Sequence, residues 1–286
     1  MKIGIGLPTT IPGARGSEVT DWAKRAEAAG FSCLGTIDRL VYPNYDSLVA
    51  LGAAAAVTER IELTTAILIV PFRGSAALVA KQAATVHALS DGRLVLGVAI
   101  GARNDDYEAA GVPLENRGGR LEQMVDEIKR LWAGEKRGYA GGVGPDVSDD
   151  PPPIIVGGQV EAAFRRAAQY GDGWMMGAAS AEVFGQAIEH LEAAWRAGGR
   201  EGEPRKMSLT YFSLDDDPET AARGTVGDYY AFAGDYADMA VAGTAKGEGE
   251  AKERVRAFED AGCDELIMFP ASSDPDQVDK LAAAVL

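Results

Sequence analysis

Short apolar runs recur along the chain, and nearly all of them precede a stretch in which apolar residues repeat every three or four positions. The runs predict buried strands, centred near residues 5, 34, 66, 97, 155, 175, 210 and 267, and the repeats predict amphipathic helices. Eight strands, each followed by a helix, in 286 residues predict a closed parallel (β/α)8 barrel, or TIM barrel. An open doubly wound sheet is the alternative.

Two segments interrupt the alternation, and we expect both to be insertions into one domain that covers residues 1–286. Residues 135–152, after the fourth strand, are rich in Gly, Asp and Pro without periodicity and predict a loop insertion. Residues 216–247, after the seventh strand, predict a helical insertion. Residues 61–70 are rich in β-branched side chains and predict one long strand.

The segment 154–176 contains a feature that predicts ligand binding. An apolar run stops at Gly157 and Gly158, a helical pattern follows, and a second glycine-rich turn leads into the next apolar run. Glycines allow a ligand to approach the backbone, and the first turn of a helix presents unpaired N–H groups. A phosphate group is the expected ligand, although a pair of glycines can equally be only a tight turn.

The balance of charge argues against polyanionic partners. Asp and Glu number 43 against 28 Lys and Arg, which gives a net charge of −15 and a pI near 4.6. Such a chain repels nucleic acid and anionic membrane surfaces. No apolar run is long enough to span a bilayer and the N-terminus does not resemble a signal peptide, so we expect a cytoplasmic protein.

Few residues could carry chemistry without help. The two cysteines, Cys33 and Cys263, are expected to be buried thiols, and neither histidine has the spacing of a metal site, so no metal is predicted. The carboxyl ends of the strands, where barrel enzymes bind their ligands, carry Asp38, Arg39, Asn104 and Asp105 as polar candidates. This small set predicts dependence on a bound cofactor, although a barrel that binds a phosphorylated sugar would look the same.

Several motifs, in this order, resemble the bacterial luciferase-like superfamily of FMN- or coenzyme F420-dependent oxidoreductases. The resemblance covers nearly the whole chain, and it rests on the following segments: AGF with IDRL (29–40), ALGAAAAVTERIELTTAILIVPFR (50–73), LSDGRLVLGVAIG (89–101), DDYEAAGVPLENRGGRLEQMVDEIKRLW (105–132), PIIVGG with GDGW (153–174) and FEDAGCDELIMFP (258–270). It implies a TIM barrel that holds a reduced flavin or deazaflavin at the carboxyl ends of its strands.

The resemblance assigns catalytic positions beside the cofactor ring to Asp38 and Arg39. Similar proteins have an acidic residue followed by histidine here, so Arg39 is a departure; an arginine stays cationic and cannot serve as an ordinary general base. Asp38 is also expected to contact the cofactor. Ala66 and Ile67 match a bulge that backs the ring in F420-dependent relatives, often through a non-prolyl cis peptide, whose isomer the sequence cannot reveal.

The resemblance also assigns the remaining cofactor contacts. Gly157, Gly158 and Gln159 match the turn that receives the cofactor phosphate, Asn104 matches a polar residue after the fourth strand, and Trp174 is placed beside the ring or in the core. FMN-binding relatives often have an arginine at the position of Ile100, so Arg103 is expected to replace it, or the cofactor is F420. From the glycine turn, Gly158→Val is expected to weaken cofactor binding with only a modest loss of stability.

The expected function is therefore hydride transfer or oxygen activation on a small organic substrate, with reduced F420 or FMN. A separate flavin or F420 reductase and a homodimer, formed through the helices around strands two to four, are further expectations. Two alternatives stay open from the sequence: a flavin-binding protein without turnover, and a barrel aldolase or isomerase for a phosphorylated metabolite. The absence of a lysine at the strand ends argues against a Schiff-base aldolase.

Overall fold

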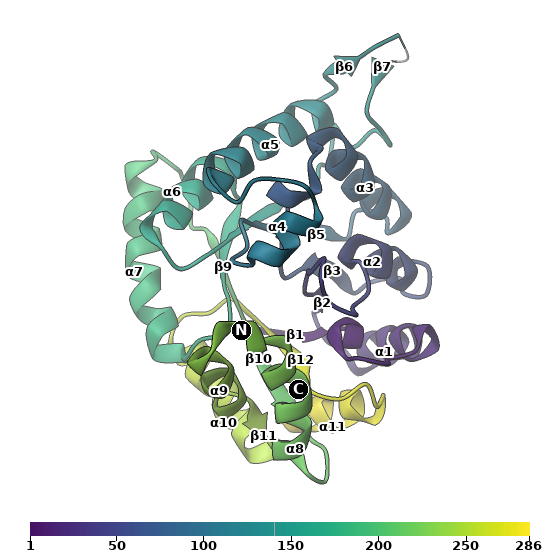
Figure 1. Ribbon diagram of the computed structural model, residues 1–286, viewed down its shortest axis with the longest axis vertical. Coiled ribbons are helices and arrows are strands. Elements are labelled where there is room, and N and C mark those ends of the chain that lie inside the picture. Colours follow the sequence, from purple (N-terminus) through teal and green to yellow (C-terminus); the bar gives the residue numbers. More distant parts are fainter. Residues whose placement is uncertain (140) are drawn as a thin grey trace.

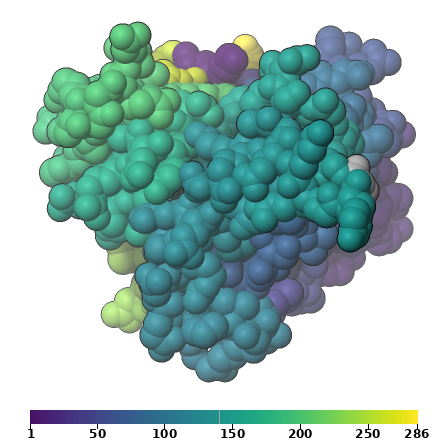
Figure 2. All heavy atoms as spheres, turned by 90° about the horizontal axis from the view of Figure 1, so that it is seen from above, coloured from purple at the N-terminus to yellow at the C-terminus, as the bar shows by residue number. Residues whose placement is uncertain are grey.

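The computed structural model describes residues 1–139 and 141–286, and its parallel strands close into a barrel surrounded by helices (Figure 1). The first and last barrel strands pair directly, Ile3 beside Leu266, so the two ends of the chain lie together, purple against yellow in Figure 2. This confirms the predicted TIM barrel and excludes the open sheet. The barrel strands are β1 (Lys2–Gly6), β2 (Cys33–Thr36), β3 (Glu62–Thr65), β4 (Leu68–Ile69), β5 (Leu94–Ala99), β8 (Ile154–Gly157), β9 (Gly173–Met176), β10 (Arg205–Ser213) and β12 (Glu265–Pro270).

The helices follow the strands and cover the outside of the barrel. Several begin where a short polar side chain caps the first turn: the carboxylate of Asp46 accepts from Leu48 N–H and Val49 N–H, and Ser75 and Ser180 act similarly. Among the described residues, none of the helices has the length and apolar character required to cross a membrane. The helices are α1 (Gly16–Ala29), α2 (Ser47–Ala55), α3 (Ala76–Leu89), α4 (Asn104–Ala109), α5 (Arg117–Trp132), α6 (Glu161–Tyr170), α7 (Ala181–Ala197), α8 (Pro218–Ala222), α9 (Asp235–Ala242), α10 (Glu248–Asp260) and α11 (Asp276–Val285).

The prediction of one long strand over residues 61–70 is wrong. The peptide between Ala66 and Ile67 is cis, and it divides the segment into β3 and β4, both of which pair with β5. The segment leaves the barrel wall at this point and returns at Leu68. A pattern of β-branched residues suits either arrangement, because both strands are buried and the peptide isomer has no signature in the pattern.

Both segments predicted as insertions contain irregular structure. Residues 135–152 include a small antiparallel hairpin, β6 (Lys136–Arg137) and β7 (Gly141–Gly142), that projects from the barrel (Figure 1). Residues 216–247 contain α8, the π-helical turn η3 (Arg223–Gly227), the 3-10 turn η4 (Ala231–Ala233), α9 and the short strand β11 (Ala245–Lys246), which pairs with the end of β10. These elements lie beside β10 in Figure 1. Two further 3-10 turns, η1 (Pro8–Thr10) and η2 (Pro71–Arg73), follow β1 and β4.

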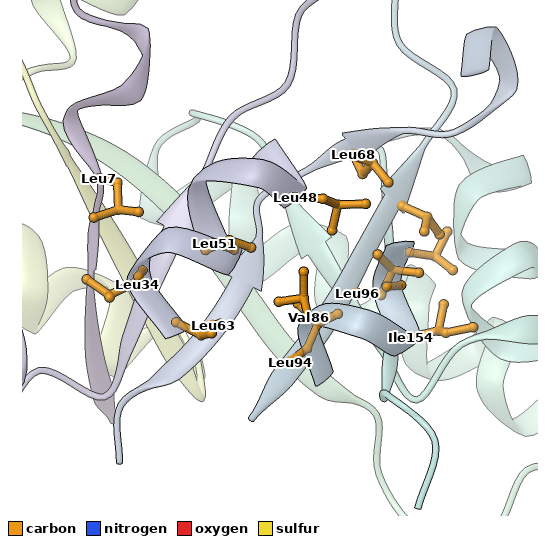
Figure 3. Close-up of a cluster of buried hydrophobic side chains, with 14 of the residues drawn as sticks. Leu7, Leu34, Leu48, Leu51, Leu63, Leu68, Val86, Leu94, Leu96 and Ile154 are labelled. Carbon is orange, nitrogen blue, oxygen red and sulfur yellow. The ribbon is translucent and has the colours of Figure 1, made fainter. Parts of the chain in front are cut away.

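The larger part of the core lies between the barrel wall and the helices. Figure 3 shows leucines of β2, β3 and β5 packed against Leu48 and Leu51 of α2 and Val86 of α3. Burying one such side chain contributes roughly 1.5–3 kcal/mol. The apolar face of α5 is buried throughout and belongs to this core; its members are Leu121, Met124, Val125, Ile128, Leu131 and Trp132.

Large side chains fill the inside of the barrel. Phe269 occupies the space opposite Gly6 and Gly35, where a Cβ would collide with its ring. At the amino-terminal end of the strands, Arg205 binds the carboxylates of Glu62 and Glu265 and closes the barrel. The carboxyl ends of the strands are left for the site, in agreement with the general rule for this fold. Cys33 and Cys263 are buried free thiols, as predicted.

Candidate functional site

Asp38 lies directly after β2 and is held by two donors. Its Oδ1 accepts from Arg73 Nη2 at 2.7 Å, and its Oδ2 accepts from the backbone N–H of Ile69 in β4 at 2.9 Å. The side chain is only 1% exposed. Burial raises the pKa of Asp38, while Arg73 and the Ile69 N–H oppose that rise. Both carboxylate oxygens are therefore engaged, one with β4 and the other with the turn η2 that follows it.

Arg39 points in a different direction, toward the insertion after β10. Its Nη2 donates to the Val41 carbonyl at 2.6 Å and its Nη1 to the Tyr229 carbonyl at 3.3 Å. The guanidinium lies over the rings of Tyr42 and Tyr229, at 4.7 and 5.2 Å from their centroids. Burial lowers the pKa of this arginine, and the nearby carboxylates of Asp105 and Asp106 act against that shift. Arg39 thus ties residues 229–232 to the end of β2.

Arg103 and Asn104 begin the short helix α4 and already have protein partners. The guanidinium of Arg103 donates to both oxygens of Asp105 and lies 3.9 Å from the centroid of the Phe232 ring. The amide of Asn104 donates to Glu108 in the next turn of the helix. Phe232 also lies near Arg39, at 5.8 Å, so the structure brings Arg39 and Arg103 together around one aromatic ring.

The glycine turn after β8 contacts two different parts of the fold. A Cβ on Gly157 would lie 2.3 Å from Cδ1 of Ile67, so this glycine faces the bulge after β3. Gly158 has a φ of +136°, and a Cβ there would lie 2.8 Å from Cβ of Ala163 in α6. The expected modest effect of Gly158→Val on stability is therefore wrong: the new side chain would meet the helix in a backbone conformation that L-residues avoid.

Trp174 lies outside the barrel wall. Its side chain is fully buried between Phe164 of α6 and Phe184 of α7, with ring centroids at 5.4 and 5.6 Å. The indole N–H donates to the Gly158 carbonyl at 2.7 Å. Because the helices cover the ring, it belongs to the core and can influence a ligand only by fixing the glycine turn. Gln159, by contrast, is exposed and lines a cavity at the ends of β8, β9 and β10.

Residues 1–285 match the family model of the luciferase-like monooxygenases. The chain belongs to this family. The match confirms the resemblance seen in the sequence motifs. Among curated proteins, an uncharacterized protein of Mycobacterium tuberculosis is 31% identical over 224 residues, which are 68% of this chain and 77% of that protein. The F420-dependent glucose-6-phosphate dehydrogenase of Nakamurella multipartita is 31% identical over 227 residues, 73% of this chain and 67% of the relative.

Solved structures of the luciferase-like family share the fold across almost their whole length. An F420-dependent secondary alcohol dehydrogenase, in complex with an F420-acetone adduct, superposes with a TM-score of 0.84 at 19% identity, covering 99% of this chain and 98% of the other. The FMN complex of the 3,6-diketocamphane monooxygenase of Pseudomonas putida gives a TM-score of 0.75 at 16% identity, covering 99% and 96%. At these identities the likeness establishes the fold alone.

Two residues around the site of this luciferase-like chain, Arg73 and Asp106, were not predicted from the sequence. Arg73 binds Asp38 and also Asp46, the capping residue of α2, at 3.0 Å. Asp106, 4% exposed, accepts from the N–H groups of Leu40 and Val41 and orders the loop after Arg39. The sequence offered one signal for Arg73, its place in the Phe72-Arg73 pair directly after the third predicted strand. An arginine at a strand end usually has a partner, so a carboxylate nearby could have been expected. Asp106 carries no such signal in the sequence.

Proposed function

We propose that this chain is an oxidoreductase that uses F420 or FMN to convert a small organic substrate at the carboxyl ends of the barrel strands. The observation that carries the proposal is the contact between Gly157 and Ile67, which joins the predicted phosphate turn to the predicted ring-backing bulge. These two features lie far apart in the sequence and on different strands. A cofactor with a flat ring and a phosphate on a flexible chain could contact both.

The glycine turn fits a phosphate group. Helix α6 has no side-chain cap at its first turn, so N–H groups there are available to an anion. A Cβ at the neighbouring Gly177 would have only Nε2 of Gln159 nearby, at 3.8 Å, which indicates open space beside the turn. We propose that Gly157, Gly158 and Gln159 hold the phosphate, and that Ala66 and Ile67 support the ring.

We favour F420 over FMN because the loop after β5 itself offers no arginine that is free of a carboxylate; Arg117 of α5 reaches this loop, but its Nε donates to the Gly101 carbonyl at 3.2 Å. Ile100 occupies the position where FMN-binding relatives often have arginine, and Arg103 is paired with Asp105 and lies against Phe232. The relative from Nakamurella and the alcohol dehydrogenase both use F420 by name. When bound in reduced form, such a cofactor supplies the hydride or activates oxygen, and a separate reductase would regenerate it.

The side chains of this site hold neighbouring segments of the chain in place, and proton transfer is not their main role. Asp38 holds the bulge through Ile69 N–H, and Arg39 and Arg103 surround Phe232 of the segment after β10. We propose that Asp38 and Arg39 lie at the edge of the ring, where the cationic Arg39 favours negative charge on the reduced cofactor. Asn104 would help to orient the loop after β5 through Glu108.

We also propose a homodimer through the helices next to β2, β3 and β5. Val49 of α2 and Leu78 of α3 are 69% and 51% exposed and belong to helices that contact each other. A second copy covering them would remove this apolar surface from water. Light scattering after size-exclusion chromatography tests the proposal: a dimer mass supports it, and a monomer mass at micromolar concentration contradicts it.

Titration with cofactors tests the proposed function. The purified protein is mixed with F420 and, separately, with FMN, and binding is followed by fluorescence. We expect micromolar or tighter binding of F420 and weaker binding of FMN. Reduced F420 is then supplied with a panel of aldehydes, ketones and alkenes under nitrogen and in air, which separates hydride transfer from oxygen chemistry. Absence of micromolar binding for both cofactors would overturn the proposal.

A further inference from the structure

A cavity opens where two neighbouring barrel strands separate. β9 and β10 pair only as far as Met176 and Ser208, whereas β10 continues beside β12 up to Phe212. Beyond the last shared pair, a cavity of about 590 Å³ lies between the strand ends and the helices α7, α9 and α10. Of these helices, α9 and α10 lie beside β10 in Figure 1. The lining includes Gln159, Ser180, Thr210, Tyr211, Tyr236 and Arg254.

The polar groups of this cavity are mostly satisfied by the protein itself. The hydroxyl of Tyr211 lies 3.0 Å from that of Tyr230, and the hydroxyl of Tyr236 donates to the Ala178 carbonyl at 2.9 Å. The Oγ of Ser180 accepts from Val183 N–H at the start of α7. Alanine, valine and methionine side chains form much of the remaining wall. The wall therefore suits the uncharged body of an organic molecule.

Arg254 of α10 is the exception, because it lines the cavity without a partner. Among the partly or fully buried arginines of residues 1–139 and 141–286, it alone makes neither a hydrogen bond nor an ion pair. Glu250, one turn earlier on α10, is close enough to act against the lowering of the Arg254 pKa by burial, but it forms no ion pair with Arg254 and accepts a hydrogen bond from the Lys246 N–H. A guanidinium has five N–H donors, and leaving them unpaired in a partly buried place is unfavourable.

We propose that this cavity binds the anionic group of an organic molecule, with Arg254 as its charge partner and the apolar wall around the rest. The planar guanidinium matches a carboxylate or a phosphate with two parallel hydrogen bonds. The anion has two possible sources: the phosphate-bearing side chain of the cofactor, extending from Gln159, or an anionic substrate beside the cofactor. The choice between these sources rests on the proposed function, but the existence of the anion site does not.

Two fluorescent probes of similar shape test the anion site directly. One is 8-anilino-1-naphthalenesulfonate, which carries a sulfonate, and the other is the uncharged N-phenyl-1-naphthylamine. We expect Arg254→Gln to weaken sulfonate binding by about tenfold or more, equivalent to about 1.4 kcal/mol, without changing the binding of the neutral probe. Arg256→Gln is the matched control, because Arg256 is exposed on the same helix and does not line the cavity.

Equal sulfonate affinity in the Arg254→Gln and Arg256→Gln variants would overturn the proposal, provided that both retain the thermal midpoint of the wild type. Cofactor titration then distinguishes the sources. If F420 or FMN displaces the sulfonate probe and binds Arg254→Gln more weakly, the anion belongs to the cofactor. If the probe binds together with saturating cofactor, and the variant retains cofactor affinity, the anion belongs to a substrate. If neither cofactor binds while the probes still discriminate, the anion site stands and the oxidoreductase proposal falls.

Discussion

Arg73 donates a hydrogen bond of 2.7 Å to the carboxylate of Asp38 at the end of β2, and the Asp38 side chain is only 1% exposed, against 13% for Arg73. A second nitrogen of the same guanidinium lies 3.0 Å from Asp46, which caps α2. One arginine from the turn after β4 therefore joins the end of β2 to the start of the next helix. A buried carboxylate depends on such a partner, because burial raises its pKa and disfavours its charge.

Removing Arg73 should therefore destabilise the fold. We expect Arg73→Gln to cost about 3–5 kcal/mol of unfolding free energy at pH 7, because Asp38 is left buried and charged without a counter-ion. Urea denaturation measures the loss. The pKa of Asp38 in the folded state should then rise further above 3.8, so the loss should be largest at neutral pH and shrink as the pH falls and Asp38 is protonated.

The double variant Asp38→Asn with Arg73→Gln is the control for this prediction. It removes both charges, so it should recover part of the stability and lose the pH dependence. A loss in the double variant as large as in Arg73→Gln, with the same response to pH, would show that the effect comes from packing and not from the unpaired carboxylate.

The contact between Gly157 and Ile67 predicts a coupled pair. Gly157→Ala should push the Ile67 side chain toward the proposed ring site and weaken F420 binding by about tenfold, or about 1.4 kcal/mol. Ile67→Val removes Cδ1, the atom that the new methyl group would meet at 2.3 Å. The double variant should therefore bind F420 nearly as well as Ile67→Val alone. Additive losses in affinity would contradict the coupling.

Gly158 should matter for stability before it matters for binding. We expect Gly158→Ala to cost about 1–3 kcal/mol, because the residue needs a positive φ and its Cβ would meet Ala163 at 2.8 Å. Gly177→Ala is the matched control at the next strand end, where only Nε2 of Gln159 lies near, at 3.8 Å. Thermal unfolding of the two variants gives the comparison, and equal stability would refute the role assigned to the Gly158 backbone.

The sequence predicted which residues lie at the strand ends better than the directions of their side chains. Strand ends follow from the apolar pattern, so Asp38, Gly157 and Gly158 could be placed at the mouth of the barrel. The direction of each Cβ depends on what lies across from it: Ile67 for Gly157 and Ala163 for Gly158. Such contacts join distant parts of the chain, and a single sequence does not reveal them.

The sequence did not reveal the partners of the charged residues either. Arg103 was expected to face a phosphate, but it pairs with Asp105, two residues away, and lies against Phe232 from the insertion after β10.

The cis peptide after β3 lies within a run of residues whose pattern predicts one strand, because local propensity does not report the isomer of a peptide bond. The barrel itself was predictable because only a few topologies are compatible with its repeated pattern of strands and helices.

Arg39 leads to a prediction about motion. Since it donates to the Tyr229 carbonyl and lies over the rings of Tyr42 and Tyr229, Arg39→Ala should release residues 228–232 from the end of β2. We expect amide hydrogen exchange in this segment to become about tenfold faster or more, while the barrel strands keep their protection. Arg39→Lys keeps the charge but loses the planar contact with the rings. The exchange rate of residues 228–232 in this variant should therefore lie between those of the wild type and of Arg39→Ala. Faster exchange throughout the barrel, with no excess in residues 228–232, would show that Arg39 stabilises the whole fold and does not specifically hold this segment.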